Sequence, residues 1–69
     1  MFSGAALCAL LELNGFAQVR QRGSHCVMQK RTAMGSITVP VPFHREIRTG
    51  TLQSIIRQSG LPRTLFETE

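Results

Sequence analysis

The length of the chain restricts it to one hydrophobic core. A domain of 69 residues buries only about 60% of the surface that its unfolded chain exposes, so its stability is modest and a bound partner would add to it. The composition is 42% hydrophobic and 17% charged, and the apolar residues are clustered, which excludes a disordered tail. We therefore expect residues 1–69 to form a single globular domain.

The first apolar segment predicts an α-helix over Gly4–Leu13. Its leucines recur at helical spacing, Ser3 can cap the start, and Asn14-Gly15 can close the end. Apart from Glu12, the remaining face of this helix carries only small apolar residues. A helix that is apolar nearly all round packs on two sides or docks on a partner.

Three short runs of strand-like residues come next, over 16–20, 25–30 and 37–41. A Gly23-Ser24 break separates the first two runs, and a loose connection over 32–35 separates the second from the third. Pro40 and Pro42 cannot donate to a strand ladder. We therefore expect the third strand to end at or near a sheet edge.

The chain after residue 42 predicts a loop to Gly50 and then a second amphipathic helix. The apolar residues of this helix are Leu52, Ile55 and Ile56. Thr49 or Thr51 is the expected cap and Gly60 the expected stop. Pro62 fits the first turn of a short terminal helix. The apolar residues of that last helix are Leu65 and Phe66.

This order of elements predicts an α+β fold. Both helices carry apolar stripes that need a sheet face to cover them, so we expect a three-stranded antiparallel sheet with two helices on one face. The α-β-β-β-α order resembles the double-stranded-RNA-binding fold. Alternation along the second strand puts Cys26 and Met28 under the helices and leaves His25 on the open face or at its rim. Three residues of the other strands are expected beside Cys26 and Met28: Val19, Ile37 and Val39.

Cys8 and Cys26 are expected to be buried small hydrophobic residues. Nothing else in the chain suggests secretion, and two Cys with two His offer no zinc spacing. Residues 2–13 are apolar, but no basic residue precedes Arg20, which argues against a signal peptide, and the run is too short to span a bilayer. We expect a cytoplasmic protein that uses no metal, no cofactor and no membrane.

The charge balance points to nucleic acid. Eight Lys and Arg residues face four acidic residues, and the net charge is +4. Seven of the eight are Arg, whose planar guanidinium group binds phosphate oxygens in pairs. A solvated basic surface is the competing interpretation for each cation taken singly. The cations that could contact RNA are Arg20, Arg22, Lys30, Arg31, Arg45, Arg48 and Arg57.

His25 is the residue best suited to catalysis. It follows Gly23, which permits close approach of an RNA backbone, and Ser24, whose hydroxyl and N–H can contact a phosphate. RNA cleavage needs a group that takes the proton of a 2′-hydroxyl as its oxygen attacks phosphorus, and an imidazole can do this without a metal. Nearby cations would stabilise the phosphorane that forms. From these residues alone, a merely polar strand histidine is an equally good interpretation.

His44 is a second candidate. It lies in a basic loop with Arg45 and Arg48, and as a general acid it would complete a mechanism with two histidines. Loop histidines are more often solvated and without a role. Nothing in the sequence fixes the distance between His44 and His25.

Four motifs, in this order, resemble the HicA toxin family: Gly15-Phe16, Gly23-Ser24-His25, Val39-Pro40 and Gly50-Thr51-Leu52. They lie in the segments LLELNGFAQVRQRGSH and ITVPVPFHREIRTGTLQSIIRQSGL, and the match covers roughly residues 3–66. The resemblance implies a double-stranded-RNA-binding-like fold and a metal-free endoribonuclease that cleaves messenger RNA, with His25 as its catalytic residue. It also implies inhibition by a HicB-type antitoxin. Family members often have a second His or an aromatic residue where this chain has Cys26, and Lys or Glu on the first helix.

Two other functions are compatible with the residues. A module of the same fold could bind double-stranded RNA by shape and 2′-hydroxyl contacts without cutting it, or the apolar first helix could serve chiefly to dock a protein. An antitoxin is expected to place apolar residues on the first helix at Ala5, Cys8 or Ala9, unless a second copy of the chain covers that helix. Its acidic side chains are expected on the basic residues around His25, which are Arg20, Arg22 and Arg48.

Overall fold

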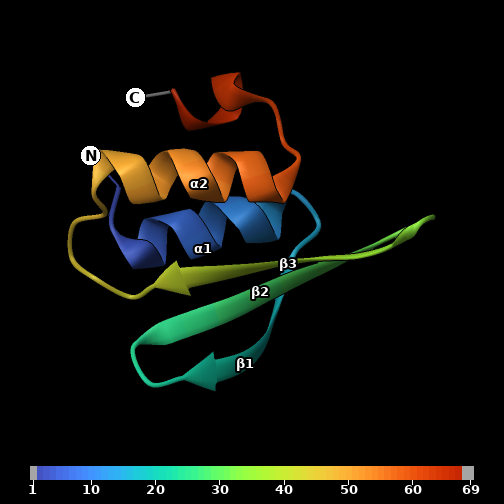
Figure 1. Ribbon diagram of the computed structural model, residues 1–69, viewed down its shortest axis with the longest axis horizontal. Helices are drawn as coiled ribbons and strands as arrows, with labels where there is room; N and C mark the ends of the chain where they lie inside the picture. The colour runs from blue at the N-terminus through green and yellow to red at the C-terminus, as the bar shows by residue number, and fades with distance from the viewer. Residues whose placement is uncertain (1, 68–69) are drawn as a thin grey trace.

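The computed structural model describes residues 2–67. Its elements follow the order α1 (Gly4–Leu13), β1 (Ala17–Arg22), β2 (His25–Thr32), β3 (Gly35–Pro42), α2 (Thr49–Ser59) and the 3-10 helix η1 (Arg63–Phe66). The strands form one antiparallel sheet in the order β1-β2-β3. Both α-helices lie on one face of it, and η1 lies on the far side of α2 from the sheet (Figure 1). The expected α+β fold, α-β-β-β-α with two helices on one face, is confirmed.

α1 begins and ends where its capping residues predicted. The hydroxyl of Ser3 accepts the N–H of Ala6 at 3.0 Å, which satisfies one of the free donors of the first turn. At the other end, the N–H of Asn14 donates to the carbonyl of Leu11 at 2.9 Å. Gly15 follows with a positive φ of 96°, a conformation that is costly for a residue with a Cβ. Local side-chain chemistry therefore decides both ends of this helix.

α2 starts earlier than expected and ends as expected. Arg48 is its N-cap residue, and the carbonyl of Arg48 accepts the N–H of Leu52 at 2.8 Å. Because this bond puts Thr49 and Thr51 inside the helix, the expectation that one of them caps it is wrong. Gly60 ends the helix with a φ of 71°, the left-handed conformation that favours glycine. The short terminal helix is also present, directly after Pro62.

The second and third strands are longer than the apolar pattern predicted. β2 and β3 stay paired as far as Thr32 and Gly35, so the connection expected to be loose is a tight turn at Ala33-Met34. Every residue over 31–36 is exposed. These residues therefore show no apolar alternation, although their backbone continues the ladder. The hairpin of β2 and β3 projects past both α-helices (Figure 1).

The core lies between the helices and the sheet. Its buried apolar residues are Leu7, Cys8, Leu11, Phe16, Cys26, Met28, Val39, Val41, Ile47, Ile55 and Phe66. Met28 and Val39 stand opposite each other in the ladder, and both are fully buried. Ile47 comes from the loop before α2, where no periodicity predicted a core residue. The ring of Phe2 meets the ring of Phe66 edge to face, with centroids 6.3 Å apart, so η1 closes the core over the N-terminal segment.

Val19 does not lie under the helices, contrary to expectation. Gln18 pairs with Met28, but Arg20 pairs with Val27, only one step along β2. Val19 is therefore the extra residue of a β-bulge, and its side chain is 53% exposed. The bulge breaks the simple alternation on which the expectation rested.

Candidate functional site

His25 lies on the sheet face that the helices leave uncovered. It is the first residue of β2, its side chain is exposed, and it stands opposite Arg22 of β1 and Pro42 of β3. The next residue, Cys26, is buried in the core, as strand alternation requires. The expected position of His25 on the open face is confirmed.

A hollow of about 350 Å³ includes His25. Residues of all three strands line it: Arg22, His25, Val27, Thr38 and Pro40. Val27 and Pro40 stand opposite each other and form its apolar surface, whereas Arg22 and His25 supply a cation and an imidazole. Sequence reasoning missed Val27, Thr38 and Pro40 as site residues, because only the register between strands shows which of them adjoin His25.

The bulge at Val19 decides which way two arginines of β1 point. After the bulge, Arg20 and Arg22 alternate onto the same face as His25. Gln18, before the bulge, stands on the core face, and unbroken alternation from Gln18 would turn Arg20 toward the helices. The bulge therefore brings both arginines to the face that carries the histidine.

The turn before His25 leaves space for a ligand. Gly23 has a φ of 59°, and no atom lies within 4 Å of the place that a Cβ would take, so a ligand can approach its backbone closely. Ser24 is exposed, and its carbonyl accepts the N–H of Phe43 at 2.6 Å. This bond fixes the turn to the end of β3. Contacts of Gly23 and Ser24 with RNA stay predictions.

His44 and Arg48 line a different hollow from His25. This second hollow, of about 240 Å³, lies between the loop after β3 and the start of α2. Its lining residues are Pro42, His44, Glu46, Ile47, Arg48 and Thr51. His44 and Arg48 are therefore not among the residues that line the His25 hollow, although Pro42, which stands opposite His25 at the end of the sheet, lines the hollow that contains His44. The acidic Glu46 lies beside His44 and Arg48. Arg45 is exposed in the same loop.

Lys30 lies on the core face of the sheet. Its ammonium nitrogen is 5.8 Å from the centre of the Phe16 ring, a distance at which a cation is attracted to an aromatic face. Lys30, one of the cations expected to contact RNA, therefore lies on the opposite face of the sheet from His25. Because side chains alternate along β2, the next residue, Arg31, lies on the open face. Arg57 belongs to α2, on the helical side of the sheet.

The sheet carries no carboxylate. No acidic residue lies between Glu12 and Glu46 in the sequence, and this interval includes all three strands. The cations on the open face are Arg20, Arg22 and Arg31. A face with arginines and no acidic group attracts a polyanion.

The two cysteines form no site on this face. Cys8 and Cys26 are buried free thiols, as expected. Burial and the neighbouring Cys26 thiol raise the pKa of Cys8 from 9.0 to about 12, which makes its thiol a poor nucleophile. Within residues 2–67, no three His, Cys, Asp or Glu side chains gather as metal ligands would. No helix in this part of the chain has the length and apolar character needed to cross a membrane.

These features define a small basic α+β domain that presents a histidine and arginines on an uncovered sheet face. The family model described as HicA toxin of bacterial toxin-antitoxin matches residues 4–61. The chain belongs to this toxin family, as the order of its motifs predicted, and membership implies an antitoxin partner. No curated protein and no solved structure matches the chain.

Proposed function

We propose that this toxin is an endoribonuclease that cleaves messenger RNA in the His25 hollow. The observation that carries the proposal is the exposed imidazole of His25 opposite Arg22, on a sheet without carboxylates. Such a face suits the polyanionic backbone of RNA, and the imidazole supplies the proton transfer that RNA cleavage needs. Loss of messenger RNA would stop translation and with it growth.

The reaction requires a proton acceptor and a proton donor. The imidazole of His25 takes the proton from a 2′-hydroxyl, whose oxygen forms a bond to the adjacent phosphorus. The bond from phosphorus to the 5′-oxygen then breaks, and the imidazolium returns the proton to this leaving oxygen. One product ends in a 2′,3′-cyclic phosphate and the other begins with a 5′-hydroxyl. No step uses a metal ion.

The groups around His25 have supporting roles in this proposal. The guanidinium groups of Arg20 and Arg22 stabilise the additional negative charge of the phosphorane. The backbone at Gly23 admits the RNA strand, and the hydroxyl of Ser24 contacts a phosphate oxygen. In this proposal His25 serves as both base and acid, and His44, which does not line the His25 hollow, has no assigned step.

We expect the antitoxin to inhibit by covering the His25 hollow. Its acidic side chains would pair with Arg20 and Arg22 and so take the places of RNA phosphates. Its apolar residues would rest on exposed residues of α1, among them Ala5 and Ala9. Cys8, also expected at that contact, is only 9% exposed and is not available to a partner. If a second copy of the chain covered α1 instead, the basic face would still be free for the antitoxin.

The variant His25→Ala tests the proposal. It should lose growth arrest on expression and RNA cleavage in vitro, while its unfolding temperature stays near that of the parent because an exposed strand residue contributes little packing. His44→Ala is the matched control, since it removes an exposed histidine outside the hollow and should keep most of the activity. A His25→Ala protein as toxic as the parent would end the case for His25. RNA binding without cleavage by the parent protein would favour the alternative, a non-catalytic double-stranded-RNA-binding module.

A further inference from the structure

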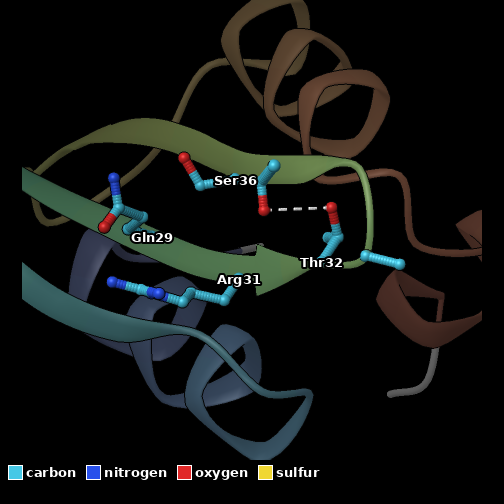
Figure 2. A pocket seen from close by; sticks show the side chains of 6 residues that line it. Gln29, Arg31, Thr32 and Ser36 are labelled. Atoms are coloured by element: carbon cyan, nitrogen blue, oxygen red, sulfur yellow. Dashed lines mark hydrogen bonds between the residues drawn. The ribbon is translucent and has the colours of Figure 1, made fainter.

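The hairpin of β2 and β3 has a further hollow at its tip, distinct from the hollows that contain His25 and His44. It measures about 400 Å³, and Figure 2 shows its lining residues on the two strands and the turn. They are Gln29, Arg31, Thr32, Ala33, Gly35 and Ser36. We propose that this hollow binds the phosphodiester backbone of the same RNA strand that His25 cuts, several nucleotides from the cut. The inference rests on the proposed ribonuclease function and extends it.

Strand alternation puts the tip hollow on the same face as His25. Gln29 and Arg31 follow His25 at even spacing along β2, and Arg31 stands opposite Ser36 of β3. Arg31 is six residue steps along β2 from His25, which corresponds to about 20 Å in an extended strand. An RNA strand lying along β2 would therefore reach both hollows without leaving the open face.

A bonded pair of side chains connects the two hollows. The amide of Gln29 donates to the hydroxyl of Thr38 at 3.2 Å; Gln29 lines the tip hollow and Thr38 lines the His25 hollow. The open face is thus polar and continuous between the two sites. This continuity favours one extended ligand over two separate small ones.

The chemistry of the tip suits a sugar–phosphate backbone. Arg31 is exposed and offers a planar set of donors to phosphate oxygens. The neutral amide and hydroxyl groups beside it can bond ribose hydroxyls, and the hydroxyl of Thr32 is held by the carbonyl of Gly35 at 3.1 Å. No aromatic residue lies on this part of the face, so the contact reads the backbone and not the bases.

Core packing does not account for the length of the hairpin, because the residues of its tip do not enter the core. Residues 31–36 are all exposed, and Met34 is 98% exposed. The hairpin nevertheless continues in register through Arg31 and Ser36. Its effect is to lengthen the open face beyond the part that the helices support.

The test measures RNA binding by a protein that cannot cut. In the His25→Ala background, Arg31→Gln should weaken binding of a 12-nucleotide single-stranded RNA and make the log–log salt dependence shallower by about 0.7. Arg63→Gln is the matched control, because it removes the same charge from η1, beyond the helical layer (Figure 1). Arg31→Lys should keep the salt slope, since it keeps the charge. Equal effects of Arg31→Gln and Arg63→Gln, or no effect of either, would overturn the proposal.

Cleavage assays separate this inference from the function on which it rests. With His25 present, Arg31→Gln should raise the KM for the 12-nucleotide RNA and leave the kcat for this substrate unchanged. Cleavage of a trinucleotide, which is too short to reach the tip hollow, should be unaffected. A parent protein that cuts no RNA refutes the proposed function, whereas normal cleavage with an unchanged KM in Arg31→Gln refutes only the tip site. If Arg31→Gln weakened antitoxin binding but not RNA binding, the tip would belong to the protein partner and the RNA proposal would be wrong.

Discussion

The N–H of Gly4 donates to the carbonyl of His44 at 2.8 Å, which ties the first turn of α1 to the loop after β3. One residue earlier in that loop, the N–H of Phe43 donates to the carbonyl of Ser24. Two consecutive loop residues therefore connect the start of α1 with the residue that precedes His25. A helix on the covered face of the sheet thus holds the backbone beside the site on the open face.

Gly4→Ala should disturb this connection. A Cβ on Gly4 would stand 2.7 Å from the Cα of Phe43, so the loop must move, and we expect a loss of about 1–3 kcal/mol in the free energy of unfolding. RNA cleavage per folded molecule should also fall, because the loop carries the bond to Ser24. Thermal unfolding and cleavage assays measure the two effects.

Gly50→Ala is the control for that experiment. It lies within α2, where nothing comes within 4 Å of an added Cβ, so it should stabilise the domain by about 0.5–1 kcal/mol without changing cleavage. A Gly4→Ala protein as stable as the parent would show that the loop yields without cost.

The chemistry of the cut can be tested on the RNA itself. A single 2′-deoxynucleotide at the cut site should block cleavage there, because the attacking oxygen is missing. Cleavage of unmodified RNA should persist in excess EDTA and leave 2′,3′-cyclic phosphate ends, which end-group analysis detects. Activity that vanishes with the chelator and returns with magnesium would contradict the proposed mechanism.

The antitoxin should form a tight complex with this toxin. Copurification should yield a complex that does not cut RNA, and its toxin should melt at a higher temperature than the free protein because the partner binds only the folded state. Arg20→Gln and Arg22→Gln should each weaken the complex, whereas Arg63→Gln should not. If the complex cuts RNA as fast as the free toxin, the antitoxin does not cover His25.

The pH dependence of stability should reveal the buried thiol. Burial and the Cys26 thiol raise the pKa of Cys8 from 9.0 to about 12, so the folded state holds a proton that the unfolded state releases above pH 9. The stabilising effect is complete below about pH 9 and is lost as the pH rises toward about 12, at no more than about 1.4 kcal/mol per pH unit. Denaturant unfolding at several pH values should show a steeper loss for the parent than for Cys8→Ala. Parallel curves would contradict the shifted pKa.

The sequence predicts those features of the fold that depend on neighbouring residues, such as the ends of the helices. Ser3 and Gly60 act within one turn of helix, so both α-helices end nearly where the sequence predicted. The tip of the hairpin and the bulge at Val19 depend instead on backbone pairing between strands. The exposed polar residues of the tip show no alternation of apolar and polar side chains that would indicate strand pairing. In β1, the one extra residue of the bulge exchanges the sheet faces of the residues that follow it.

The candidate site, too, could be predicted from the sequence only in part. Alternation within one strand was enough to predict that His25 and Cys26 lie on opposite faces. Whether distant residues adjoin His25 depends on tertiary structure. Lys30 lies on the other face of the sheet, and His44 lines another hollow. Charge alone could not sort the arginines and the lysine by face, because charge pattern carries no information on strand register.

The edge-to-face contact of Phe2 with Phe66 has a consequence for the order of synthesis. Phe2 leaves the ribosome early, but its partner is made 64 residues later, at about 5–20 residues per second. His25, Arg22 and the rest of the open face therefore emerge on a chain whose core is still open. The core that supports the open face is complete only after Phe66 of η1 has been made.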